Sequence, residues 1–157
     1  MDISTQLIVA IVPGLIIAVF SSFYAARKTL DGFYAQQWWQ LKSKSYSDIL
    51  LALYGMKDYY QTQMYVFQTG SELSEEKKGE LNTRLTSGFD EVKKATAIGS
   101  FIISNQASEY LDKFVKNYRN VYNAQDWYAE MDEKWGLIDN CITDLREYAK
   151  KDLKKKE

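Results

Sequence analysis

The run from Ile3 to Ala26 contains no charged side chain, and this feature constrains the chain more than any other. Its most apolar part reads LIVAIVPGLIIAVF, from Leu7 to Phe20. An α-helix rises about 1.5 Å per residue, so a helix over the whole run is longer than the ~30 Å hydrocarbon core of a bilayer. The sequence therefore predicts a transmembrane helix over residues 3–26.

The residues that flank this run predict its orientation. Phe23 and Tyr24 fall where aromatic rings favour the headgroup layer, and Arg27 and Lys28 follow directly. All 20 basic residues lie at position 27 or beyond, whereas Asp2 is the only charged residue before the run. By the positive-inside rule we expect a single pass through the bilayer, with a short N-terminus outside and the rest of the chain in the cytoplasm.

Two other interpretations of the run fit less well. A cleaved signal peptide would have basic residues before the apolar stretch and small residues at a cleavage site. Here no basic residue precedes the run. Cleavage after Ala25 or Ala26 would place an aromatic residue, Phe23 or Tyr24, at the −3 position, where a small residue is expected. A buried core helix is usually shorter or carries a polar stripe. We therefore favour the membrane span.

Small residues recur at every fourth position of the predicted span, at Gly14, Ala18, Ser22 and Ala26. This spacing places them on one face of a helix, where small side chains let a second helix approach closely. A single pair of small residues at this spacing is weak evidence for helix association, but here the spacing is kept over four positions. We predict that the protein self-associates through this face.

Beyond residue 27 the apolar residues follow helical spacing. We predict an all-α fold, in which the transmembrane helix is followed by an antiparallel four-helix bundle over residues 27–157. The first helix of the bundle is expected at about residues 29–68, and Gly70 suits its C-terminal cap. Between Ala26 and Leu41 the only clear breaker is Gly32, so the span can continue into this helix. Its expected apolar stripe is Leu41, Ile49, Leu53, Met56, Tyr60, Met64 and Phe67.

Three further helices are expected. The second starts near Ser74, with Glu75 and Glu76 in its first turn, and ends at Gly99. Ser104 caps the third, and the fourth covers about residues 125–153. Their apolar positions are Leu81, Leu85, Phe89 and Val92 in the second, Ala107, Leu111, Phe114, Tyr118 and Val121 in the third, and Tyr128, Met131, Trp135, Ile138, Ile142, Leu145 and Ala149 in the fourth.

The residues that the chain lacks exclude several kinds of chemistry. None of its 157 residues is histidine, so Ser-His and Cys-His nucleophile pairs and HExxH zinc sites cannot form. The one cysteine, Cys141, lies between predicted core positions and is expected to be a buried structural residue. Glu130 and Lys134 are spaced for a surface salt bridge. We predict that the protein is not an enzyme and uses no cofactor or metal.

The C-terminal sequence KKDLKKKE is strongly basic. Such a run could contact anionic lipid or RNA without sequence specificity. More often a basic helix end is solvated and complements the helix dipole. We favour that second interpretation, and we do not expect RNA binding.

The layout resembles a known group of proteins. A single N-terminal span, a long emerging helix with the aromatic cluster Gln37-Trp38-Trp39 and two helical hairpins resemble the membrane accessory proteins of type VI-B, RNA-targeting CRISPR systems. The resemblance implies a HEPN-like bundle on the bacterial inner membrane, and ring-shaped pores that strengthen antiphage defence. It also implies a cytoplasmic nuclease or defence protein as a partner.

In one respect the chain departs from HEPN ribonucleases, which pair an arginine with a histidine four to six residues further on. No histidine follows Arg84, Arg119 or Arg146. Arg119 and Arg146 are therefore at most vestiges of a nuclease pair, and the departure favours a structural role over RNA cleavage.

These observations lead to one main hypothesis and one alternative. In the main hypothesis the protein is an oligomeric membrane pore or pore-like defence accessory. Gly14, Ala18 and Ser22 would pack between protomers, Pro13 would kink the span, and Ser21 would face a lumen. In the alternative the span is only an anchor, and the bundle is an adaptor that binds a cytoplasmic partner protein.

Overall fold

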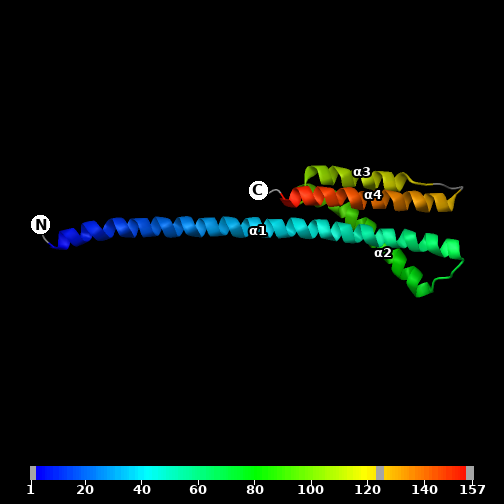
Figure 1. Cartoon of the computed structure of the whole chain (residues 1–157), viewed down its shortest axis with the longest axis horizontal. Helices are drawn as coiled ribbons and strands as arrows, with labels where there is room; N and C mark the ends of the chain where they lie inside the picture. Colours follow the sequence, from blue (N-terminus) through cyan, green and yellow to red (C-terminus); the bar gives the residue numbers. More distant parts are fainter. Residues whose placement is uncertain (1–2, 123–125, 155–157) are drawn as a thin grey trace. The chain divides into compact units, whose positions relative to one another are not determined.

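The computed structural model describes residues 3–122 and 126–154, with side chains described from Ser21 onward except at Ser100. Within these ranges all regular secondary structure is helical, without strands, which confirms the predicted all-α helical bundle (Figure 1). The elements are α1 (Ile3–Thr69), α2 (Glu75–Ile98), the short 3₁₀ helix η1 (Gly99–Phe101), α3 (Asn105–Asn120) and α4 (Trp127–Lys154).

The chain forms two compact units, Met1–Trp39 and Gln40–Glu157. The first consists of the N-terminal part of α1, and every side chain described in it is exposed. The second holds the remainder of α1 and all the other helices. No break separates the apolar run from the first helix of the bundle, so the expectation of one continuous helix is confirmed.

The core of the second unit is built from the apolar faces of its helices. Most of the predicted stripe positions of α1, α3 and α4 are buried, because side chains three and four apart share one face of a helix. The buried core cluster comprises Tyr46, Ile49, Leu53, Met56 and Tyr60 of α1, Val92 of α2, Ile103, Ala107, Leu111, Phe114 and Val115 in and before α3, and Ile138, Cys141, Ile142, Leu145 and Ala149 of α4.

Two positions of the predicted α1 stripe are wrong, and one core residue of α1 was not predicted. Leu41 and Phe67 are exposed, whereas Tyr46, which the predicted stripe omitted, is 2% exposed. The core face of α1 therefore begins at Tyr46. Phe67 lies near the end of α1, and its ring contacts Trp127 and Tyr128 at the start of α4 instead of entering the core.

The predicted caps are confirmed. The Ser74 and Ser104 hydroxyls accept hydrogen bonds from the backbone N–H groups of Lys77 and Ala107, which are otherwise unpaired in a first helical turn. Gly70 has a φ of 63°, a left-handed conformation that glycine adopts without steric cost.

A hydrogen-bonded junction ties three elements together at one end of the bundle. The Asp152 carboxylate accepts hydrogen bonds from the Ser104 N–H, at 2.9 Å, and from the Tyr46 hydroxyl, at 2.7 Å. The junction therefore holds the start of α3 and the end of α4 against the first core turn of α1. Burial and the carboxylate contact raise the pKa of Tyr46 to about 12, although the Ser104 hydroxyl opposes this shift.

Helices α1 and α2 approach closely at Gly88. A Cβ atom there would lie 2.8 Å from the Ala52 carbonyl oxygen and 3.0 Å from Cγ of Met56. Only a residue without a side chain fits this contact, since the Ala52 oxygen belongs to the backbone and cannot rotate away. Glycine at position 88 thus determines how near α2 lies to α1.

We expect Gly88→Ala to lower the free energy of unfolding by about 1–3 kcal/mol, because the new methyl group must separate the two helices. Gly79→Ala in the same helix is the matched control. Its Cβ would meet nothing within 4 Å, so the better helix propensity of alanine should raise stability by roughly 0.5–1 kcal/mol. Urea titration of the full chain in detergent, followed by near-ultraviolet circular dichroism, measures both. Equal effects of the two variants would contradict the close contact.

Stability should fall as the pH rises above 10, because the Tyr46 phenol ionises near pH 10 in the unfolded chain and near 12 in the folded protein. The stabilisation is complete below pH 10 and is lost between these values. Burial raises the pKa of Tyr60 and Tyr110 in the same direction. We expect Tyr46→Phe to reduce the slope of unfolding free energy by about 1.4 kcal/mol per pH unit. Tyr122→Phe, at an exposed ring, is the control, and an identical slope in both variants would refute the assignment.

Candidate functional site

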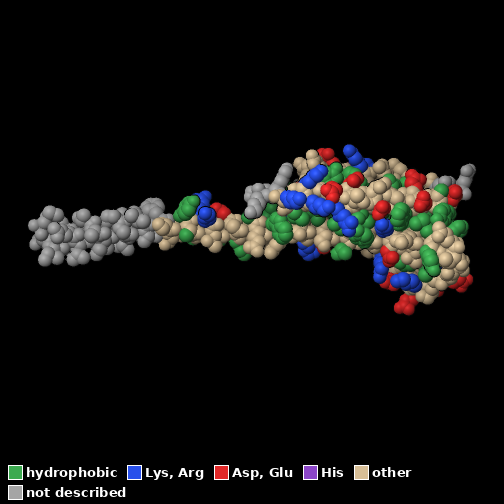
Figure 2. Space-filling model, viewed as in Figure 1, with side chains coloured by type: hydrophobic (Ala, Val, Ile, Leu, Met, Phe, Trp, Pro, Cys, Tyr) green, Lys and Arg blue, Asp and Glu red, His purple; other side chains and the backbone are tan. Residues whose placement is uncertain are grey.

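The first unit presents apolar side chains to its surroundings. The large hydrophobic side chains described in it are between 42% and 71% exposed, and they comprise Phe23, Tyr24, Leu30, Phe33, Tyr34, Trp38 and Trp39. Asp31 is the only charged residue from Thr29 to Trp39. Figure 2 shows hydrophobic side chains on the surface of this part of α1. A helix surface so poor in charge is typical of an interaction site.

The predicted membrane-interface residues lie on consecutive turns of α1. Phe23, Tyr24, Arg27 and Lys28 are all exposed. Within the described residues, no helix is both long enough and apolar enough to cross a membrane.

The residues predicted for oligomerisation and the pore fall into two groups. Ser21 and Ser22 are described and lie exposed on α1. Pro13, Gly14 and Ala18, like most of the predicted span, lie outside the residues whose side chains are described.

The two candidate HEPN-like arginines have separate partners. The guanidinium carbon of Arg119, at the end of α3, lies 5.5 Å from the centroid of the Phe89 ring. That of Arg146, on α4, lies 5.5 Å from the centroid of the Tyr54 ring. Both contacts are cation–π interactions, worth about 0.5–1 kcal/mol at exposed sites, and they stabilise the surface of the bundle.

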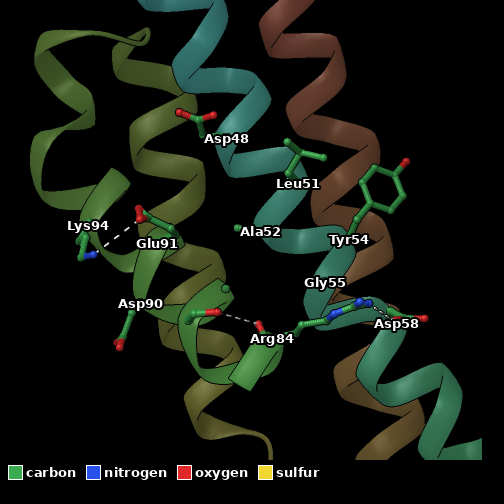
Figure 3. Close-up of a pocket in the computed structure, with 12 residues that line it drawn as sticks. Asp48, Leu51, Ala52, Tyr54, Gly55, Asp58, Arg84, Asp90, Glu91 and Lys94 are labelled. Atoms are coloured by element: carbon green, nitrogen blue, oxygen red, sulfur yellow. Dashed lines mark hydrogen bonds and ion pairs between the residues drawn. The ribbon is translucent and has the colours of Figure 1, made fainter. Parts of the chain in front are cut away.

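An open groove of about 960 Å³ lies between α1 and α2 in the second unit. Figure 3 shows Asp48, Leu51 and Gly55 along α1, and Arg84 and Lys94 along α2, around this groove. Periodicity did not predict the groove, because it depends on how α1 and α2 cross. The small residues on both helices are the signal that could have indicated a close crossing.

Arg84 and Lys94, the two basic side chains that line the groove, form ion pairs within the bundle. Arg84 Nη1 lies 3.0 Å from an oxygen of Asp58, and its other terminal nitrogen pairs with Glu80. Lys94 lies 3.6 Å from Glu91 along the same helix. Both cations of the groove therefore have carboxylate partners within α1 and α2.

Cys141 is fully buried in the core, as predicted. Burial raises the pKa of its thiol to about 12, so the thiol remains protonated at neutral pH and is a poor nucleophile. No group of three or more metal-ligating side chains is found in the described part of the chain.

The expectation that Glu130 and Lys134 pair at the surface is wrong in one respect. They do pair, at 2.5 Å, but their side chains are only 14% and 18% exposed. Lys134 lies over the ring of Tyr118, whose hydroxyl forms a hydrogen bond with that of Tyr60. Spacing identified the pair, but packing between helices, which sequence spacing does not contain, leaves it only partly exposed.

The basic end of α4 fits the solvated interpretation. Lys150 pairs with Glu147 at 2.7 Å, and both side chains are exposed. Lys151 and Lys154 lie in the last turn, where cations complement the helix dipole. Figure 2 shows basic side chains gathered over this end of the helix. Lys155 and Lys156 lie outside the described residues.

Comparison of the chain with protein-family models, with curated proteins and with solved structures yields no match.

We expect Glu130→Gln to lower the free energy of unfolding by about 2 kcal/mol, because it leaves the partly buried Lys134 ammonium without its counter-charge. Adding Lys134→Met should recover most of this loss. Asp112→Asn is the matched control, since it breaks an exposed pair with Lys116 at the same spacing and should cost less than about 0.5 kcal/mol. Urea titration of the wild type and these three variants measures the changes in unfolding free energy. Equal losses for Glu130→Gln and Asp112→Asn would show that burial has no effect.

Proposed function

We propose that this protein is a single-pass protein of the bacterial inner membrane that assembles into an oligomeric pore or pore-like accessory of antiphage defence. The observation that carries the proposal is the uncharged run from Ile3 to Ala26, which continues without interruption into an exposed aromatic segment of the same helix. The N-terminus lies outside and the bundle lies in the cytoplasm.

The physical argument for insertion begins with the backbone. A continuous α-helix satisfies its own N–H and C=O groups, which is the condition for spanning a hydrocarbon core. The exposed rings of Phe23 and Tyr24 suit the headgroup layer, and the charges of Arg27 and Lys28 suit its cytoplasmic side. The hydrogen-bonded backbone of the helix and the side chains at its cytoplasmic end thus both favour insertion into the bilayer.

The argument for assembly rests on the small residues of the span. Gly14, Ala18 and Ser22 allow two helices to pack closely in lipid. Pro13 favours a kink, and Ser21 supplies an uncharged polar group for a lumen. The described part of the bundle provides neither a reactive thiol nor a cluster of metal ligands, so a role through assembly requires the least additional chemistry.

The connection to defence comes from the resemblance to type VI-B CRISPR accessory proteins. In that setting the bundles form a cytoplasmic collar, and Arg119 and Arg146 stabilise its helices rather than cleave RNA. Their contacts with Phe89 and Tyr54 support this role.

Images and light scattering of the detergent-solubilised full chain test the proposal. We expect closed rings, and a monomeric particle would overturn it. We also expect dye release from vesicles that contain the wild-type protein. Replacing residues 3–26 by an unrelated leucine-rich span should abolish both ring formation and dye release, because the small-residue face is lost.

The alternative is a membrane-tethered adaptor, and the groove between α1 and α2 is the observation that favours it. Leu51 is 67% exposed beside this groove and offers an apolar contact. The adaptor predicts that the chain with the replaced span remains active in a phage-protection assay, whereas Leu51→Lys abolishes protection. The pore predicts the opposite result for both variants.

A further inference from the structure

A second open groove, of about 580 Å³, lies between the end of α1 and the start of α4. The two helices run antiparallel there, because Lys57 pairs with Asp139 whereas Gln68, further along α1, donates a hydrogen bond to the hydroxyl of Tyr128, near the start of α4. We call this space the aromatic groove. Its lining includes Asp58 and Tyr65 of α1, and Tyr128, Asp132 and Trp135 of α4.

Three aromatic rings line the aromatic groove. Tyr65 is 62% exposed, and Tyr128 and Trp135 are half-buried. The face of such a ring carries negative potential and attracts a cation within about 6 Å of the ring centroid. The Trp135 ring already makes one contact of this kind, since the Lys57 ammonium lies 4.9 Å from its centroid.

The charges that line the aromatic groove are negative. None of the described residues that line it is basic, whereas Asp58 and Asp132 each contribute a carboxylate. Arg84 compensates Asp58 at 3.0 Å, and Lys57 is compensated by Asp139. Asp132 is exposed and forms no ion pair with any residue that the structure describes. One uncompensated carboxylate therefore lies in the same groove as three aromatic rings.

This combination discriminates between classes of ligand. A phosphate or carboxylate ligand would be repelled by Asp132, and an uncharged apolar ligand would remove water from that carboxylate without replacing it. Mg²⁺ and Ca²⁺ need several oxygen ligands, whereas one of the two carboxylates here is already paired with Arg84. An alkylammonium ion instead offers both a positive charge and apolar surface that packs against aromatic rings.

We propose that the aromatic groove binds a small organic cation of the alkylammonium class. The alkyl groups lie against the rings of Tyr65 and Tyr128, and the positive charge faces Asp132. The volume of the groove falls within the range of about 300–1,000 Å³ that is typical of small-molecule sites. The inference concerns the bundle alone and does not depend on the proposed membrane pore.

Saturation-transfer difference NMR of the full chain with tetramethylammonium chloride tests the inference. The method observes the methyl protons of the free ligand, so it applies to a particle of any size, and a non-ionic sugar detergent avoids competing cations. We expect saturable binding, with a dissociation constant in the range of about 1–10 mM. The neutral analogue tert-butyl alcohol should bind at least several-fold more weakly, and sodium chloride at equal ionic strength should not displace the ligand.

Two pairs of variants locate the site. Asp132→Asn removes the uncompensated charge and Tyr65→Leu removes an aromatic face, so each should weaken binding roughly two- to fivefold. Glu133→Gln and Tyr122→Leu are the matched controls, because Glu133 and Tyr122 are exposed and neither lines the aromatic groove. All four substitutions are at exposed positions, and near-ultraviolet circular dichroism checks that each variant keeps its fold.

Three results would overturn the inference. These are the absence of saturable binding, equal affinity for tetramethylammonium and tert-butyl alcohol, and equal losses for the groove variants and their controls. A monomeric particle would contradict the proposed pore, but it would leave this binding measurement unaffected.

Discussion

The bundle depends on one face of α1, because each of the other helices is held by contacts to it. Helix α2 contacts it where Gly88 meets the Ala52 carbonyl, α3 through the hydroxyl pair of Tyr118 and Tyr60, and α4 through the Tyr46–Asp152 hydrogen bond. These contacts extend along the α1 core face from Tyr46 to Tyr60. A change in the register of this face would therefore misplace all three partners at once.

Features that depend on neighbouring residues could be predicted from the sequence, whereas those that depend on packing could not. The caps at Ser74 and Ser104 follow from hydrogen bonds within one turn, and they are confirmed. The start of the core face at Tyr46 depends on where α4 and the α3 cap reach α1, which no local pattern contains. The burial of Glu130 and Lys134 and the groove at Gly88 have the same origin.

The candidate site was predictable only in its N-terminal part. The absence of charge from Ile3 to Ala26 is a property of composition, and the exposed aromatic residues beyond it are part of the same helix. The groove between α1 and α2 could not be predicted, because it arises from a close crossing of two helices. Arg119 and Arg146 were selected through a resemblance to nucleases, and the structure provides each with an aromatic ring instead.

The two units differ in what their own packing leaves uncovered. In the bundle, charged groups such as Arg84 and Lys57 find carboxylates within the unit, and its apolar stripes meet in one core. In the first unit, the apolar side chains of Leu30, Tyr34 and Trp38 have no such cover. Exposed apolar area carries a free-energy cost of roughly 25 cal/mol per Å² in water, and that cost is relieved only when another surface covers the area. The bundle also exposes apolar side chains such as Leu51 and Phe101, but it has a buried core, whereas every side chain described in α1 before Gln40 is exposed.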